Sequence, residues 1–124
     1  MDTLTTRASD VITSDRVTGT DVFNPAGDSL GTIDHLVIDK RSGQVVYAVL
    51  EFGGLFGLGT DRYPLPWGTL KYDLEKDGYV VPLEKEQLSD APRYSSEALE
   101  GRPPFDEAYG RSVYEYYKTP WLFI

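Results

Sequence analysis

The side chains that could do chemistry in this chain are few, and its single histidine, His35, is the first to consider. Together with Ser29 and Asp39 it offers the residue types of a nucleophile, base and acid set, and with Asp34 and Asp39 it offers metal-binding types. All four residues fall within one predicted β segment, where side chains four to six residues apart stand about 13 to 20 Å apart. Because catalytic groups must reach hydrogen-bond contact, we expect no catalytic residue and no metal ligand here, and we interpret His35 as a surface residue of the sheet.

The Gly-rich segment 53–59, with the sequence Gly-Gly-Leu-Phe-Gly-Leu-Gly, is the second feature that could bind a ligand. It lacks the Gly-Lys-Ser/Thr ending of a phosphate-binding loop and the third glycine of the dinucleotide fingerprint. The prolines Pro64 and Pro66 follow soon after, so no helix N-terminus would face a phosphate. We therefore expect no cofactor, and we interpret the segment as a hairpin loop whose Leu55, Phe56 and Leu58 cover one end of the sheet or contact a partner.

Composition excludes several classes of function. Twenty acidic residues against twelve basic ones give a formal charge of −8, which repels phosphate backbones, so we expect no nucleic-acid partner. The absence of cysteine excludes disulfides and thiolate chemistry. We find no signal-peptide pattern at the start and no apolar run of the roughly 20 residues that a membrane span needs, which predicts a soluble, cytoplasmic protein without membrane insertion. A length of 124 residues predicts one domain.

The turn signals predict a mainly β fold. Asn24-Pro25-Ala26-Gly27-Asp28 is a turn that joins strands at about 19–23 and 30–40, and Arg41-Ser42-Gly43-Gln44 leads into a strand at about 45–52. This last strand is apolar on both faces, which indicates a central strand that is covered twice. Further strands are expected at 63–66, 67–73 and 79–83, with an Asp77-Gly78 hairpin turn before the last.

Several short motifs, in this order and spacing, resemble those of the PRC-barrel family: Leu30-Gly31-Thr32-Ile33, Leu36-Val37-Ile38-Asp39, Gly43, Tyr47-Ala48-Val49, the Gly-rich loop, Pro66-Trp67 and Leu70. The family includes the cytoplasmic part of the photosynthetic reaction-centre H subunit, and the chain is also similar to the C-terminal domain of a bacterial ribosome maturation factor. The resemblance covers residues 18–83 and implies a small antiparallel β-barrel. It brings no shared set of catalytic residues, so none is assigned.

We expect the rest of the chain to flank this barrel. Residues 1–17 form an N-terminal arm that packs through Val11 and Ile12. Residues 84–124 form a C-terminal extension with a helix at about 105–117, opened by Pro104 or Asp106, and an apolar tail. Four residues at four-residue spacing give the expected buried stripe of this helix, and they are Phe105, Tyr109, Val113 and Tyr117.

The sequence favours a non-enzymatic protein-interaction or adaptor module that self-associates as a homodimer. Exposed apolar clusters mark interfaces, and the expected partner contacts are Leu55, Phe56, Leu58, Trp121, Leu122 and Phe123. The tail could dock on its own barrel or on a second copy, and we favour the second copy. The alternative function is a small-ligand-binding or sensor barrel whose aromatic pocket is lined by Tyr63, Trp67 and Tyr72.

Overall fold

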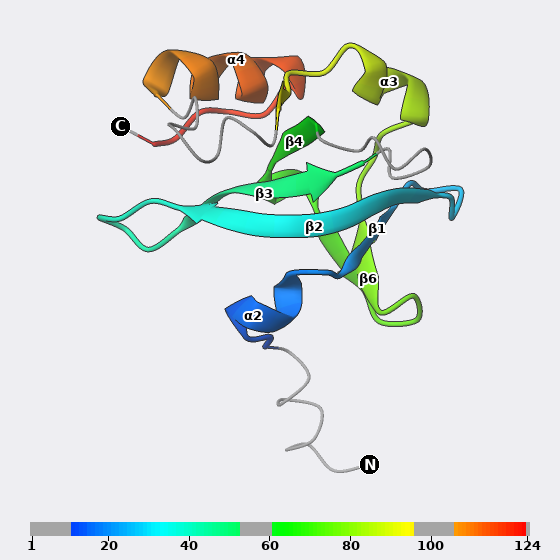
Figure 1. Cartoon of the computed structure of the whole chain (residues 1–124). Helices are drawn as coiled ribbons and strands as arrows, with labels where there is room; N and C mark the ends of the chain where they lie inside the picture. Colours follow the sequence, from blue (N-terminus) through cyan, green and yellow to red (C-terminus); the bar gives the residue numbers. More distant parts are fainter. Residues whose placement is uncertain (1–10, 53–60, 96–105, 124) are drawn as a thin grey trace.

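The computed structural model describes residues 11–52, 61–95 and 106–123. Within these ranges the chain is mainly β, as expected, and it is arranged in layers (Figure 1). One sheet lies in the middle, with helices α3 (Lys85–Ser89) and α4 (Glu107–Tyr116) on one side and the short helix α2 (Ser14–Val17) on the other.

The sheet has the strand order β5-β6-β1-β2-β3-β4-β7 in the described residues. The bounds of its strands are β1 Asp21–Phe23, β2 Ser29–Ile38, β3 Val45–Glu51, β4 Asp61–Pro66, β5 Lys71–Asp73, β6 Gly78–Val80 and β7 Tyr94–Ser95. Here the sheet is open rather than closed, because the short strands β5 and β7 lie at its two edges and do not pair with each other. The expectation of a closed barrel is therefore corrected.

The expected antiparallel arrangement holds for all of these pairings except one. Strand β6 lies parallel to β1, with Val22 opposite Tyr79 and Phe23 opposite Val80. The predicted strand at 67–73 also begins differently, because Trp67–Thr69 form a 3-10 turn before β5. This turn redirects the chain so that the β5–β6 hairpin reaches the free edge of β1. Local turn signals predict hairpins between neighbouring strands, and they carry no information on such a distant pairing.

The turn between β1 and β2 forms where it was predicted, around a buried side chain. Asn24 is only 1% exposed, so its amide needs partners within the protein. Its Oδ1 accepts a hydrogen bond from the backbone N–H of Asp28 at 2.9 Å, and its backbone carbonyl accepts one from Gly27. Gly27 has a φ of +93°, which explains the glycine at this position.

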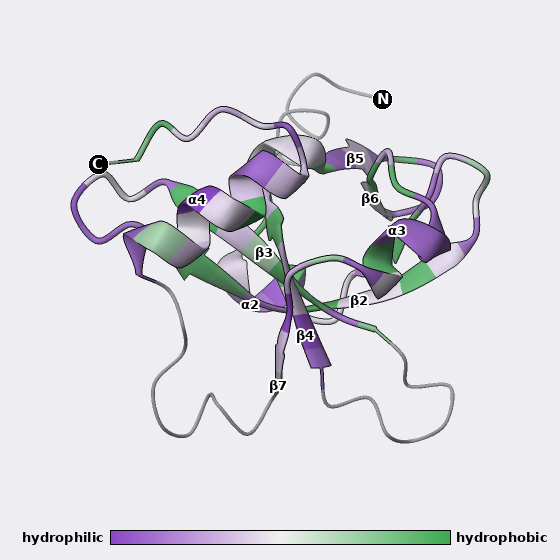
Figure 2. Ribbon diagram, turned by 90° about the horizontal axis from the view of Figure 1, so that it is seen from above, coloured by the Kyte–Doolittle hydropathy of each residue, from purple (hydrophilic) through white to green (hydrophobic). Residues whose placement is uncertain are grey.

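Strand β3 is buried on both faces, as its sequence predicts. Ala48 and Leu50 belong to a core that also includes Val17 of α2 and Leu88 of α3, whereas Tyr47 and Val49 belong to a second core beneath α4 and the C-terminal tail. Figure 2 shows hydrophobic residues along β3 under these C-terminal elements. The C-terminal extension is therefore part of the folded core.

The N-terminal arm packs differently from the expectation. Val11 and Ile12 are 76% and 45% exposed, so they do not anchor the arm. Val17, at the end of α2, is buried in the core instead. One turn of helix, which was not predicted from the sequence, carries Val17 to the sheet.

Helix α4 begins at the predicted cap, since the Asp106 carboxylate accepts a hydrogen bond from the backbone N–H of Tyr109 at 2.8 Å. Its buried residues are Gly110, Val113 and Tyr114. The predicted stripe included Val113 but missed Tyr114, whose hydroxyl donates to the carbonyl of Val46 at 2.5 Å. Phe105, which set the predicted stripe, lies outside the described residues.

We predict that Gly31→Ala lowers the free energy of unfolding by about 2 to 4 kcal/mol. Gly31 has a φ of +134°, and a Cβ atom there would lie 2.2 Å from the carbonyl oxygen of Glu51. Gly43→Ala is the matched control, because Gly43 has a φ of +77° and no atom within 4 Å of such a Cβ. The control should lose only about 1 kcal/mol in urea denaturation. Equal losses in the two variants would show that the contact with Glu51 is unimportant.

Candidate functional site

The C-terminal face carries the most exposed large apolar side chain of the described residues. We define this face as α4, the tail 118–123 and the adjoining ends of β2 and β3. Leu122 is 79% exposed, whereas its neighbours Trp121 and Phe123 are partly buried against the second core. The tail therefore presents one apolar residue between two that anchor it.

The tail is held by a group of aromatic rings on its own chain. Trp121 and Phe123 meet the ring of Tyr114 edge-on, with centroid separations of 5.1 and 5.9 Å. Their own centroids are 5.4 Å apart. Such edge-to-face pairs stabilise packing beyond the area that they bury. Of the three tail residues predicted to contact a partner, only Leu122 is free to do so without leaving this packing.

Gly110 makes the docking of the tail possible. A Cβ atom at this helical position would lie 2.6 Å from Cη2 of Trp121 and 2.6 Å from the hydroxyl of Tyr47. The glycine therefore leaves the space into which the indole of Trp121 fits. Gly110 was not predicted as a site residue, although a glycine inside a predicted helix is a signal of close packing.

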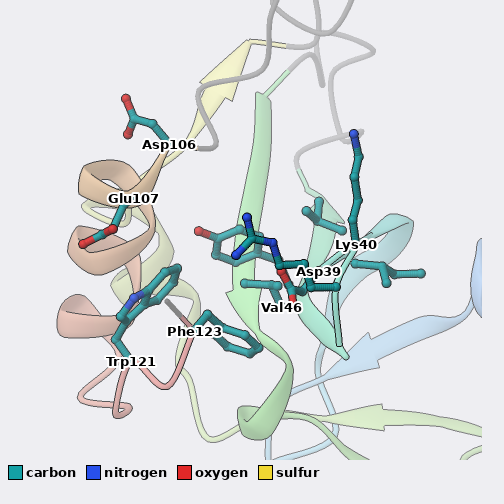
Figure 3. A pocket seen from close by; sticks show the side chains of 11 residues that line it. Asp39, Lys40, Val46, Asp106, Glu107, Trp121 and Phe123 are labelled. Atoms are coloured by element: carbon teal, nitrogen blue, oxygen red, sulfur yellow. The ribbon is translucent and has the colours of Figure 1, made fainter. Parts of the chain in front are cut away.

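Two depressions border the tail. The tail–hairpin groove, of about 340 Å³, lies between the tail, the start of α4 and the β2–β3 hairpin (Figure 3). Its apolar lining includes Val37, Val46, Trp121 and Phe123. The tail–sheet groove, of about 390 Å³, has an apolar lining that includes Val45, Trp67, Leu122 and Phe123. Leu122 thus lies at the edge of the tail–sheet groove, on the C-terminal face.

The aromatic residues of the ligand-pocket alternative lie in different surroundings. Tyr63 is buried and meets Phe52 edge-on at 5.9 Å. Trp67 lines the tail–sheet groove, whereas Tyr72 is 40% exposed and lines a polar depression beside α2. Tyr79 lies against both rings, at 5.6 Å from Trp67 and 5.2 Å from Tyr72. The described depressions do not bring the three predicted residues together.

His35 lies in a charged cluster on the sheet. Asp34 lies at an irregularity in the β2–β3 register, between Ile33 and His35. Its Oδ2 is 2.7 Å from His35 Nδ1 and 3.4 Å from Arg62 Nε. Sequence reasoning missed this contact, because in a regular strand adjacent side chains point to opposite faces.

Asp39, which was considered for both catalysis and metal binding, has different partners from Asp34 and His35. The Asp39 carboxylate accepts hydrogen bonds from the backbone N–H and the hydroxyl of Ser42, and so closes the β2–β3 turn instead of approaching His35. Among the described residues, no group of three or more acidic or histidine side chains is placed to hold a metal ion. The predicted contacts Leu55, Phe56 and Leu58 lie outside the described residues.

Tyrosines fill the space between α4 and the sheet. Burial raises the pKa of Tyr109 and that of Tyr114 each to about 12. The pKa values of Tyr47, Tyr94 and Tyr117 are also raised, again chiefly by burial. These hydroxyls stay protonated near neutral pH, so they act here as packing and hydrogen-bonding groups.

The described residues form a small β-sheet domain whose C-terminal face exposes the apolar side chain of Leu122. A family model of the PRC-barrel domain matches residues 9–88, which is well over half of the chain. The chain therefore belongs to the PRC-barrel family, as its motifs indicated. PRC-barrel domains are a protein-interaction type of fold and are generally non-catalytic. A search of curated proteins found no match.

No helix within the described ranges is long and apolar enough to cross a membrane.

We predict that Gly110→Ala destabilises the protein, although alanine is favoured over glycine in a helix by about 1 kcal/mol. The added methyl group should displace Trp121, so both the free energy of unfolding and the tryptophan fluorescence should change. Ser112→Ala on the exposed side of α4 is the control and should leave both nearly unchanged. A more stable Gly110→Ala variant with unchanged fluorescence would contradict the packing described for the tail.

We also predict alkaline unfolding as the buried tyrosines ionise. Their pKa values are higher in the folded state than the ordinary value near 10, so they stabilise the fold fully below about pH 10. This contribution is lost as the pH rises from about 10 towards 12, the value for Tyr109 and Tyr114. Tyrosinate absorbance and circular dichroism should therefore change together in a base titration. Complete tyrosine ionisation in a protein that keeps its native circular dichroism would contradict the prediction.

Proposed function

We propose that this protein is a non-enzymatic protein-interaction or adaptor module, and that it self-associates through its C-terminal face. The observation that carries this proposal is Leu122, which is 79% exposed beside an apolar groove although both of its neighbours are packed. An apolar side chain held out by a rigid aromatic base loses little conformational entropy when a partner covers it. The membership of a protein-interaction family supports the same function.

A second copy of the chain is the partner that fits this face best. Leu122 and the tail–sheet groove lie on one surface, so each copy offers both a projecting side chain and a hollow. A two-fold interface pairs the same patch of two subunits and needs this kind of self-complementarity. Since Trp121 and Phe123 pack on their own chain, the proposed contact is shared between surfaces and requires no exchange of the whole tail.

Two further predictions from the sequence, the loop contacts and the small-ligand alternative, stay predictions. Leu55, Phe56 and Leu58 remain a second predicted partner contact. The small-ligand alternative remains a prediction without a specific observation in its favour, because Tyr63, Trp67 and Tyr72 line no common described depression.

We predict that Leu122→Asp abolishes or strongly weakens self-association, because the carboxylate would have to be desolvated in the interface. Leu74→Asp is the matched control, since Leu74 is 74% exposed in the β5–β6 turn, away from α4 (Figure 1). Light scattering after size exclusion, over a range of concentrations, measures the effect. Truncation after Thr119 is a poorer test, because it also removes Trp121 and Phe123 from the core.

The result expected is a dimer for the unaltered chain and for Leu74→Asp, and a monomer for Leu122→Asp with unchanged circular dichroism. A monomer for the unaltered chain at every concentration would refute self-association. Dimers of equal strength in all three proteins would show that the contact lies elsewhere.

A further inference from the structure

The charges around the tail–hairpin groove are unevenly distributed. Lys40 and Arg41 line it from the β2–β3 turn together with Asp39, and Asp106 and Glu107 line it from the start of α4. Figure 3 shows Lys40 and Asp39 on one side and Asp106 and Glu107 on the other, with the apolar residues of the tail between them. The groove therefore has a net positive edge with two basic residues and one acidic residue, here called the basic edge, an apolar floor and an acidic edge.

The acidic side chains are held in place by their own chain, whereas the basic ones are not. The carboxylate of Asp106 caps α4, and Glu107 lies 2.8 Å from Nε of Arg111. Both partners of this ion pair are exposed, which leaves the carboxylate of Glu107 accessible to a further cation. Within the described ranges, Lys40 and Arg41 take part in no such ion pair. The charge of Arg41 acts on the neighbouring Asp39, but the carboxylate of Asp39 accepts its hydrogen bonds from Ser42. Two basic side chains against one carboxylate leave this edge net positive and able to meet a further acidic group.

This arrangement selects among possible partners. A uniformly acidic surface would be attracted to the basic edge and repelled by the acidic one, and a uniformly basic surface would meet the opposite problem. A second copy carries both signs at the same spacing. Rotation by 180° about an axis through the groove exchanges its two edges, so each basic edge then faces the acidic edge of the other copy.

We propose that two copies pair about a two-fold axis through the tail–hairpin groove, with Lys40 and Arg41 of each copy against Glu107 of the other. This inference rests on the proposed function and extends that interface across Phe123, which lines both grooves, from the tail–sheet groove to the tail–hairpin groove. The net charge of −8 opposes the approach of two copies. Attraction between these edges would offset this repulsion only in the paired register, which makes the edges a determinant of specificity.

Charge reversal followed by mixing tests the register. One variant carries Lys40→Glu and Arg41→Glu, and the other carries Glu107→Lys. Asp106 stays unchanged because it caps α4. Each variant alone should self-associate at least about tenfold more weakly, since like charges then face each other at both contacts. An equimolar mixture should recover association as a heterodimer, because every basic edge again faces an acidic one.

The controls carry the same changes in charge away from the groove. Lys71→Glu with Lys85→Glu matches the first variant, and Glu86→Lys matches the second, since all three residues are exposed on other elements. Sedimentation velocity with a fluorescent label on one variant distinguishes heterodimers from homodimers. The controls should associate like the unaltered chain, and mixing them should produce no preference for heterodimers.

The outcomes separate this inference from the proposed function. Recovery on mixing, seen only with the groove variants, supports the two-fold register. If Leu122→Asp prevents association but reversing the groove charges has no effect, the face is an interface and the proposed register is wrong. Weakening by the controls to the same extent would attribute the effect to net charge, and would also overturn the register. A chain that is monomeric throughout refutes both proposals.

Discussion

The burial of strand β3 on both faces is the constraint on which the rest of the structure depends. Its residues Val46–Leu50 are all buried, so each face needs its own cover. One face packs into a core that includes Val17 of α2 and Leu88 of α3, and α4 and the tail cover the other face. A strand of this kind cannot leave either side to water, because each exposed apolar side chain costs about 1.5 to 3 kcal/mol. The C-terminal extension is thus required by a strand some sixty residues earlier in the chain.

This requirement links the family fold to the proposed interface. The residues matched by the family model end at 88, whereas α4 and the tail, which cover the second face of β3, lie beyond them. The same segment therefore has two roles, since its inner side completes the core and its outer side presents Leu122 and the two grooves. A docking surface built on such a segment is rigid, because the aromatic rings beneath it are fixed by Gly110 and Tyr114.

Much of the fold could be predicted from the sequence where the signal was local. The turn at Asn24–Asp28, the two-sided burial of β3 and the cap at Asp106 each depend on neighbouring residues and were predicted correctly. The open sheet and the parallel β1–β6 pair depend on distant contacts, which no local pattern encodes. For the site, the apolar tail could be recognised, but which of its residues is exposed could not. The exposure of each tail residue depends on the space beside Gly110, into which Trp121 fits. Tyr47, sixty-three residues earlier in the chain, also borders this space.

The prolines of β4 have a consequence for the behaviour of the chain outside its native state. Pro64 and Pro66 lie opposite Val49 and Tyr47 and, like those residues, are buried in the folded protein. If the C-terminal extension detached, this apolar part of the sheet would become a template for strands from other molecules. Proline has no N–H group to donate, so the row of donors along β4 is interrupted at two positions. Partial opening should therefore lead less readily to fibrillar aggregation than the hydrophobicity of β3 and β4 alone would suggest.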